Sequence, residues 1–275
     1  MFDRKLLKSR AKAVLSTSYW QTFGTILLFS FASTFITNFF TLKIPPTVTV
    51  SSPRLMLVFG ITMLMRMIMQ FAAMVFLTTP LQTGLNKYLL DYARGGVPGI
   101  NTLAYAFRNN YKKILWVMLA KQLIIIAFTI IPVILACIAI AYVFISKGYA
   151  LPTVIDTHQI EKLTITLSES PEYAVISLAL IILLIPAIIK IYDYYLVEYI
   201  IADDSSLGWR EALRKSKQMM RGNRFSVFVL GLSFIGWEML GILAFGIGTV
   251  FVTPYILATD AQLYLELSGK STFEF

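Results

Sequence analysis

Several ionisable residues fall inside long apolar stretches, where a charge can do chemistry that a surface charge cannot. The four main candidates are Arg66, Lys190, Asp193 and Asp260, and Lys121 and Glu238 also lie in such stretches. A charge inside a membrane is costly, so such residues usually pair with one another or bind an ion or ligand. Arg66 lies near the middle of GITMLMRMIMQF, where its side chain has the longest way to either membrane surface. We expect Asp193 to pair with Arg66 or Lys190, and the four residues to form structural ion pairs or a ligand site.

A second charged group lies between two apolar stretches, in segment 202–224. At 100° per residue, one stripe of a helix there carries Arg210, Arg214, Lys217 and Arg221, and a second stripe carries Trp209, Leu213, Ser216 and Met220. This pattern predicts a basic amphipathic helix in the headgroup plane, with its apolar stripe in the acyl boundary and its basic stripe against anionic lipid. An ordinary positively charged loop without a specific ligand also fits. Binding to nucleic acid is disfavoured, because the next apolar stretch follows at once.

Other chemistry has little support in the sequence. Cys137 and His158 are the single cysteine and histidine of the chain, which argues against a cysteine-based or histidine-rich metal centre. Asp156, His158 and Glu161 are metal-ligand types, but three mixed ligands in one loop are a weak signal. There is no Ser/His/Asp or Cys/His arrangement and no nucleotide-binding motif. We therefore expect no enzymatic activity, no cofactor and no metal.

The elements that position these residues are membrane spans. The chain has 275 residues, of which 57% are hydrophobic and 14% charged, whereas a soluble domain is about a quarter charged. Six stretches reach the roughly 20 apolar residues that a span needs. They are 19–42, 55–79, 114–145, 173–201, 225–243 and 245–267. The first is too long for a signal peptide and is interpreted as a retained span. All six belong to one membrane domain, 1–275.

The distribution of basic residues predicts the orientation. The segments 1–18, 80–113, 202–224 and 268–275 hold 17 of the 24 Lys and Arg residues, and the loops 43–54 and 146–172 hold four. Cytoplasmic loops of membrane proteins carry the excess of Lys and Arg. Both termini are therefore predicted to be cytoplasmic, with 1–18, 80–113 and 202–224 as inner amphipathic segments. The outer loop 146–172 includes KLTITL, which has the alternation of a short strand.

A threefold pattern runs through the chain. An amphipathic lead and a polar break precede the first, third and fifth stretches, with breaks at Ser18–Tyr19, Asn110–Tyr111 and Asn223–Arg224. The second, fourth and sixth stretches carry Pro80, Pro186 and Pro254, each followed by a tyrosine-bearing continuation. The pattern predicts three related helical hairpins, an organisation common in transporters. Any membrane hairpin with an inner entry and an inner exit would give a similar pattern.

The C-terminal part of the chain resembles bacterial membrane proteins of the "domain of unknown function 975" family. The resemblance rests on KSKQMMRGNRF followed by LSFIGWEMLGILAFGIGTVFVTPY. The matching positions are Ser216, Met219, Met220, Gly222, Leu232, Ser233, Phe234, Trp237, Gly246, Gly248, Pro254 and Tyr255, with Arg10, Ala13 and Tyr19 near the N-terminus. The resemblance is specific in the C-terminal part and loose elsewhere. It implies a polytopic protein of the bacterial cytoplasmic membrane, and it supplies no activity or substrate.

Together these patterns predict an all-α polytopic membrane protein of the cell membrane, with about six transmembrane helices in three hairpins and cytoplasmic amphipathic helices. We expect a non-enzymatic module that binds anionic lipid or a membrane-protein partner, which could be a second copy of the chain. The alternative is a small transporter with a polar site near Arg66.

Overall fold

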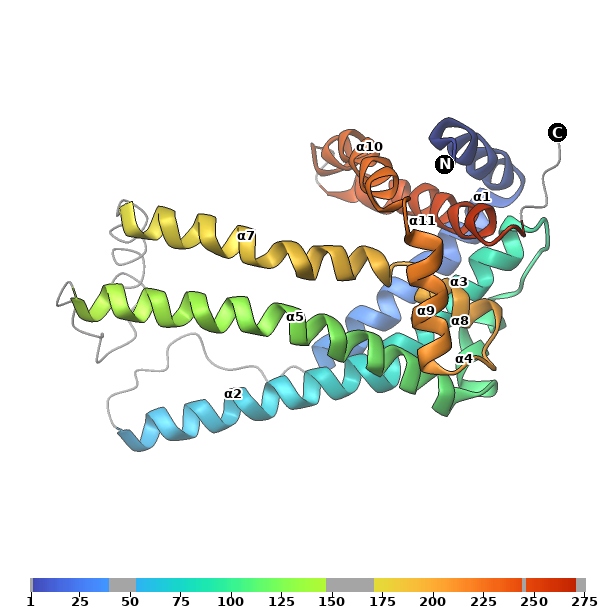
Figure 1. The fold of residues 1–275 in the computed structure, drawn as a ribbon. Helices are drawn as coiled ribbons and strands as arrows, with labels where there is room; N and C mark the ends of the chain where they lie inside the picture. The colour runs from blue at the N-terminus through green and yellow to red at the C-terminus, as the bar shows by residue number, and fades with distance from the viewer. Residues whose placement is uncertain (1, 40–52, 147–170, 244–245, 271–275) are drawn as a thin grey trace. The chain divides into compact units, whose positions relative to one another are not determined.

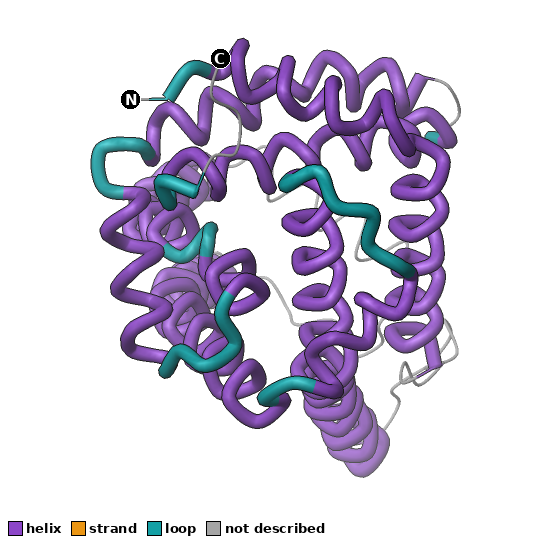
Figure 2. The backbone as a smooth tube through the Cα atoms, turned by 90° about the vertical axis from the view of Figure 1, so that its right-hand side faces the viewer, coloured by secondary structure: helices purple, strands orange, loops and turns teal. Residues whose placement is uncertain are grey.

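The computed structural model describes residues 2–39, 53–146, 171–243 and 246–270. All regular structure in these ranges is helical (Figures 1 and 2). Five helices are long and apolar enough to cross a membrane. They are Arg4–Phe39, Leu57–Ala93, Tyr111–Val143, Pro171–Asp203 and Arg224–Leu243. The prediction of an all-helical membrane protein is confirmed at this level, while the predicted strand in loop 146–172 lies outside the described residues.

The first part of the chain runs through two long helices with interruptions. Helix α1 (Arg4–Phe39) leaves helical geometry at Ser18, where φ is −152° and ψ is 46°. Helix α2 (Pro53–Ala73) continues through the π-helical turn η1 (Met74–Thr78) into α3 (Thr79–Ala93). The wider turn lies just before Pro80, whose ring cannot pack against an ordinary α-helical turn and which has no N–H to donate.

Shorter elements connect the remaining long helices. The 3₁₀ turn η2 (Ile100–Ala104) and α4 (Tyr105–Arg108) lead into α5 (Tyr111–Ser146). The chain continues through α7 (Pro171–Asp193), α8 (Val197–Asp203) and α9 (Trp209–Met220). It ends with α10 (Arg224–Leu243) and α11 (Ile247–Leu267). The described parts of the six predicted spans are mainly helical. The second predicted span also takes in η1 and the start of α3, the fourth crosses the turn between α7 and α8, and residues 40–42 and 245 lie outside the described ranges.

Helix α11 differs from the other five long helices, because it is not among those apolar enough to span by composition. Its second half carries Thr259 and Gln262, both buried, as well as the half-buried Asp260. These polar side chains lower the mean hydropathy of the helix below that of its neighbour α10. The sixth span therefore stays a prediction.

The chain divides into two compact units, one of which holds most of the polar contacts. It comprises Met1–Asn38, Ala72–Lys121 and Tyr192–Phe275, and α3 packs against both α8 and α11 within it. Its largest fully buried side chains include Tyr88, Tyr264 and Leu196. The other unit comprises Phe39–Phe71 and Gln122–Ile191. Its helices expose large apolar side chains, such as Ile131 on α5 and Ile181 on α7, which suits a lipid environment.

The three predicted breaks are real backbone features. Besides Ser18 in α1, Asn110 before α5 and Gly222 before α10 adopt positive φ, at 50° and 82°. Tyr19 and Tyr111, the residues after the first two breaks, make matching hydrogen bonds. The Tyr19 hydroxyl donates to the carbonyl of Phe251 at 2.9 Å, and the Tyr111 hydroxyl donates to that of Phe76 at 2.9 Å. Both carbonyls lie within one turn before a proline, where helical hydrogen bonds are lost. The arrangement as three hairpins stays a prediction.

Candidate functional site

Helix α9 has a buried face and a charged face. The buried face consists of Ala212, Leu213, Ser216 and Met220. The exposed face carries Arg210, Arg214 and Lys217, and we include in it the exposed Arg221, which caps the end of the helix in extended conformation. Two glycines mark the ends of the helix: Gly208 precedes it in extended conformation, and Gly222 follows it at positive φ. Its charged face therefore points away from the protein core.

The structure corrects one part of the sequence interpretation of α9. Leu213, Ser216 and Met220 do not enter the acyl boundary of a membrane, because they are packed inside the protein. Met220 is fully buried, and the Ser216 hydroxyl donates a hydrogen bond of 2.8 Å to the backbone carbonyl of Asp193. The apolar stripe was assigned to lipid because periodicity alone does not say which apolar environment covers it. Trp209 remains exposed at the start of the helix.

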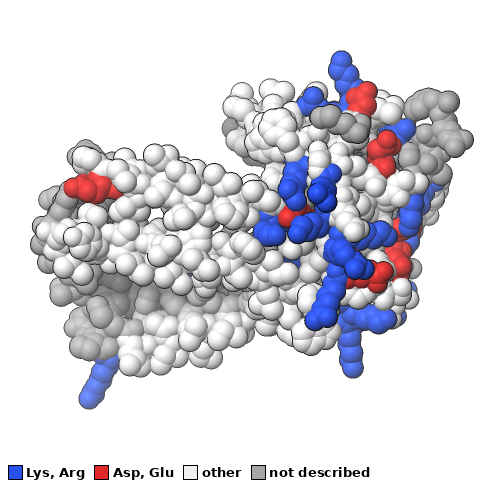
Figure 3. Space-filling view, in the orientation of Figure 1, with Lys and Arg blue, Asp and Glu red and all other residues white. Residues whose placement is uncertain are grey.

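The exposed face of α9 keeps its positive charge. None of its four basic side chains forms an ion pair with a carboxylate in the described parts of the chain. The Arg210 guanidinium lies over the Trp209 ring, 4.9 Å from the ring centroid. Figure 3 shows Lys and Arg gathered over the region of α9, whereas the atoms over α5 and α7 in the same view are almost all uncharged. This face can bind an anion or an anionic surface.

Of the ionisable residues singled out in the sequence, Asp193 has a well-defined partner. Its carboxylate accepts a hydrogen bond of 2.6 Å from Nε of Arg224, the first residue of α10. Lys190 places its ammonium 5.4 Å from the centre of the Phe128 ring. Arg66 is half-buried in α2 and has no ion pair within the described ranges. The expected pairing of Asp193 with Arg66 or Lys190 stays a prediction.

Asp260 belongs to a polar group that four helices build together. Lys121 of α5 donates to Oε1 of Glu198 at 2.7 Å, and Asn86 of α3 donates to Oε2 at 3.2 Å. One turn away on the same chain segment, the Tyr195 hydroxyl donates to Oδ2 of Asp260 at 2.8 Å. We call Asn86, Lys121, Tyr195, Glu198 and Asp260 the interior polar site. Asp260 and Lys121 interrupt predicted spans and could be found from the sequence, whereas Asn86, Tyr195 and Glu198 were missed, although Glu198 also interrupts an apolar run.

A second group of charges joins the ends of α3, α8 and α11. The Asp203 carboxylate accepts hydrogen bonds from Arg94 at 2.5 Å, Lys270 at 2.6 Å and Tyr264 at 2.9 Å. A repeat signal could have found this contact, because Gly95 and Gly269 each lie 15 residues after the proline of a Thr-Pro pair and both have positive φ, at 85° and 68°. Three strong donors on one carboxylate fix these helix ends.

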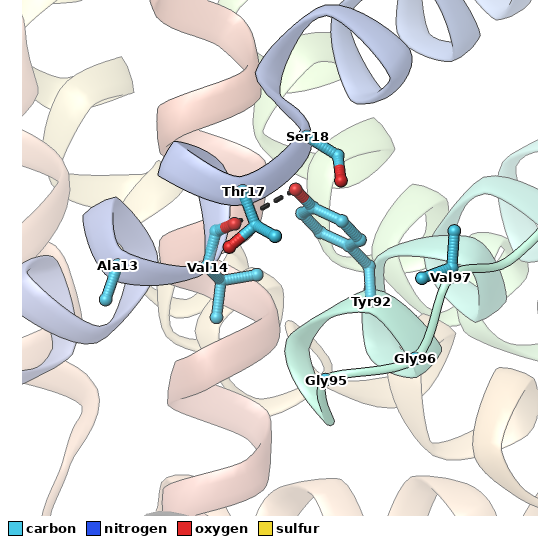
Figure 4. Close-up of a pocket in the computed structure, with 8 residues that line it drawn as sticks. All are labelled: Ala13, Val14, Thr17, Ser18, Tyr92, Gly95, Gly96 and Val97. Atoms are coloured by element: carbon cyan, nitrogen blue, oxygen red, sulfur yellow. Dashed lines mark hydrogen bonds between the residues drawn. The ribbon is translucent and has the colours of Figure 1, made fainter.

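A pocket of about 230 Å³ lies where the break in α1 faces the end of α3 (Figure 4). It is lined by Ala13, Val14, Thr17, Ser18, Tyr92, Gly95, Gly96 and Val97. The Tyr92 hydroxyl is already used, because it donates to the carbonyl of Val14 at 2.9 Å. The lining offers two hydroxyl groups and no charged side chain. Its chemistry suits a small apolar group better than an anion or a metal.

Comparison with known proteins places the chain in a family without assigning an activity. No curated protein and no solved structure matches it. It matches the family described as "Protein of unknown function (DUF975)" over residues 1–271, which extends the resemblance seen in the C-terminal part to nearly the whole sequence. The break of α1, the basic α9 and the interior polar site all lie inside this match. The chain therefore belongs to the DUF975 family.

Proposed function

We propose that this protein is a non-enzymatic, multi-pass protein of the cell membrane that binds anionic lipid headgroups through the exposed face of α9. The observation that carries the proposal is the set of four basic side chains without carboxylate partners in the described residues, opposite a face that is buried in the protein. Because the buried face anchors the helix, the charged face is held in place. Each Lys or Arg near an anionic membrane surface contributes on the order of 1 kcal/mol.

The place of α9 in the chain supports a membrane surface as its partner. Three residues separate the end of α9 at Met220 from the start of α10 at Arg224. Helix α10 is one of the five helices apolar enough to cross a membrane. A basic helix that leads directly into a span lies at headgroup level, on the side of the membrane where Lys and Arg are in excess.

We also propose that α11 is the sixth crossing and that both termini are cytoplasmic. The connection between α10 and α11 has three residues, 244–246, and the two helices pack against each other. Gly241 and Gly248 make this approach possible, because a Cβ atom on Gly241 would lie 2.6 Å from the Thr249 nitrogen. Packing after so short a turn brings α11 back along α10. The C-terminus then returns to the side from which α10 starts.

The orientation is testable with single cysteines. In a Cys137→Ser background, we expect Lys5→Cys, Lys217→Cys and Lys270→Cys to react with a membrane-impermeant thiol reagent only after cells are permeabilised. All three positions are on helices or at helix ends of the described structure, and Lys5 and Lys217 are exposed. Labelling of Lys270→Cys in intact cells would contradict the sixth crossing. Labelling of Lys217→Cys in intact cells would contradict the inner position of α9.

The lipid proposal is testable by native mass spectrometry of protein released from discs with equal phosphatidylglycerol and phosphatidylcholine. Wild type should retain phosphatidylglycerol, and a variant with Arg210, Arg214, Lys217 and Arg221 changed to Gln should lose that preference. A matched variant with the three arginines changed to Lys keeps the charge and should keep the preference. Equal retention by the Gln variant and wild type would contradict the proposal. A bound protein partner, lost in the Gln variant, would redirect it to protein recognition.

The second candidate is a small transporter with a polar site near Arg66. One observation favours it: Arg66 is half-buried in an apolar helix and has no ion pair within the described ranges. A membrane-embedded cation of this kind is a default candidate for a ligand site. Solute flux into vesicles that is lost in Arg66→Gln and kept in Arg66→Lys would support transport. Equal flux in both variants would exclude Arg66 as the site.

A further inference from the structure

The interior polar site contains one carboxylate whose charge no basic side chain in the described ranges balances. Most carboxylates that lie wholly or partly inside the described structure have a basic partner. The pairs are Asp91 with Lys87, Asp193 with Arg224, Asp203 with Arg94, Glu198 with Lys121 and Glu266 with Arg10. Asp260 is different, because among the described residues it forms no ion pair and accepts one hydrogen bond, from Tyr195.

Of the two carboxylates in the interior polar site, Asp260 and not Glu198 has an oxygen without a hydrogen bond to a described residue. Both oxygens of Glu198 are occupied, Oε1 by the Lys121 ammonium and Oε2 by the Asn86 amide. Asn86 is itself held by Gln82, which donates to its Oδ1 at 3.3 Å. Oδ2 of Asp260 is used by Tyr195, while Oδ1 has no hydrogen bond to any described residue. One carboxylate oxygen therefore remains available to a ligand.

The surroundings of Asp260 make an unbalanced charge expensive. Asp260 lies seven residues before Leu267, which at 1.5 Å per residue is about 10 Å from the end of α11. The groups that face it are Tyr195, in the turn before α8, and Glu198 and Tyr199 of α8. Lys121 of α5 and Asn86 of α3 reach the same site through Glu198. An isolated carboxylate between packed helices of a membrane protein is costly, so an ion or a proton normally neutralises it.

We propose that the interior polar site binds a monovalent cation at Asp260. The two carboxylates and the single ammonium leave one negative charge, which a ligand with one positive charge cancels and a divalent ion would overcompensate. Lys121 acts as a fixed counter-ion for Glu198, and Tyr195 orients the Asp260 carboxylate. The ligand is Na⁺, K⁺ or a proton, which share this charge and are separated by the test. The proposal is independent of headgroup binding by α9.

The test compares wild type, Asp260→Asn and Asp204→Asn in lipid discs by thermal unfolding. Na⁺ or K⁺ replaces N-methylglucamine at constant ionic strength, and a second series varies pH from 5 to 9 without either metal ion. We expect the wild-type Tm to rise by at least about 2 °C, saturably, with one metal ion or with falling pH, because a ligand of the native state stabilises it. Asp260→Asn should lose the rise. Asp204→Asn removes an exposed carboxylate and should keep it.

Each outcome decides the proposal. The same rise in Asp260→Asn as in wild type would place the cation elsewhere, and no rise in wild type with Na⁺, K⁺ or pH would exclude a cation site. Should Asp260→Asn fail to fold, Tyr195→Phe replaces it. This variant removes the hydrogen bond to Oδ2, so the half-saturating concentration should shift by about tenfold, since a bond to a charged group is worth roughly 1.5 kcal/mol. An unchanged midpoint in Tyr195→Phe would overturn the proposal.

Discussion

The exposed face of α9 and the interior polar site both carry charge that the described chain does not neutralise, with opposite sign and in opposite surroundings. On α9 four basic side chains face outward, and the half-buried carboxyl group of Asp260 accepts a hydrogen bond from Tyr195 and has no basic partner among the described residues. The charges between these extremes are mostly paired, as at Asp193 with Arg224 and at Asp203 with Arg94. This difference predicts two kinds of ligand: anions at the exposed face of α9, and one monovalent cation at Asp260 in the interior polar site.

The largest loss of unfolding free energy should come from a substitution at the close contact between α3 and η2. A Cβ atom on Gly84 would lie 2.1 Å from the Leu103 carbonyl oxygen, which is backbone and cannot rotate away. Gly84→Ala should therefore lower the free energy of unfolding by about 3 kcal/mol, at the upper end for overpacking. Gly24→Ala is the matched control, since a Cβ there meets nothing within 4 Å. Equal stability of the two variants in SDS-induced unfolding would contradict the packing of α3 against η2.

A smaller loss of unfolding free energy is expected when one partner of the Lys121–Glu198 ion pair is removed. Lys121→Met leaves the Glu198 carboxylate without its ammonium, whose Nζ lies 2.7 Å away. Breaking a fully buried pair costs about 3–5 kcal/mol, and since the Glu198 side chain is 31% exposed we expect about 2 kcal/mol here. The double variant Lys121→Met with Glu198→Gln should recover most of this loss, because no charge is left unpaired. A double variant as unstable as the single one would mean that packing, not charge, is the cause.

The smallest effects should separate the two faces of α9. Ser216→Ala removes the hydrogen bond to the Asp193 carbonyl and should cost about 1 kcal/mol of unfolding free energy. Lys217→Ala changes the next residue, on the exposed face, and should stay within about 0.5 kcal/mol of wild type. Both variants are measured in the same unfolding assay. A larger loss for Lys217→Ala than for Ser216→Ala would reverse the assignment of the faces.

Much of the fold could be predicted from the sequence, because long apolar runs and helix breakers act locally. The described parts of the six expected spans are mainly helical, and Ser18, Asn110 and Gly222 leave helical geometry at or next to the expected breaks. The basic stripe of α9 followed from 3.6-residue periodicity. Periodicity does not identify the covering surface, however, and the stripe of Leu213, Ser216 and Met220 was therefore assigned to lipid although it packs inside the protein.

The interior polar site could be predicted only in part, since it depends on contacts between distant segments. Asp260 stood out because it interrupts an apolar helix, but its partner Tyr195 lies 65 residues away in sequence. Arg224 was counted as one more basic loop residue, whereas it pairs with Asp193 across 31 residues. No local pattern carries such pairings. The sequence feature that came nearest to predicting a tertiary contact was the equal spacing of a Thr-Pro pair and a glycine in the α3 and α11 regions, which points to the contact at Asp203.

The most direct test of headgroup binding places a fluorescent donor on α9 itself. Trp209 stays as the single tryptophan when Trp20, Trp116 and Trp237 are changed to Phe, and it lies beside Arg210. Energy transfer is measured to dansyl-labelled phosphatidylglycerol and, in parallel, to dansyl-labelled phosphatidylcholine at equal density. We predict stronger energy transfer to phosphatidylglycerol than to phosphatidylcholine. High salt should reduce this preference, because exposed charges are screened. The preference should be absent when Arg210, Arg214, Lys217 and Arg221 are Gln. Equal transfer to both lipids at low salt would contradict the account.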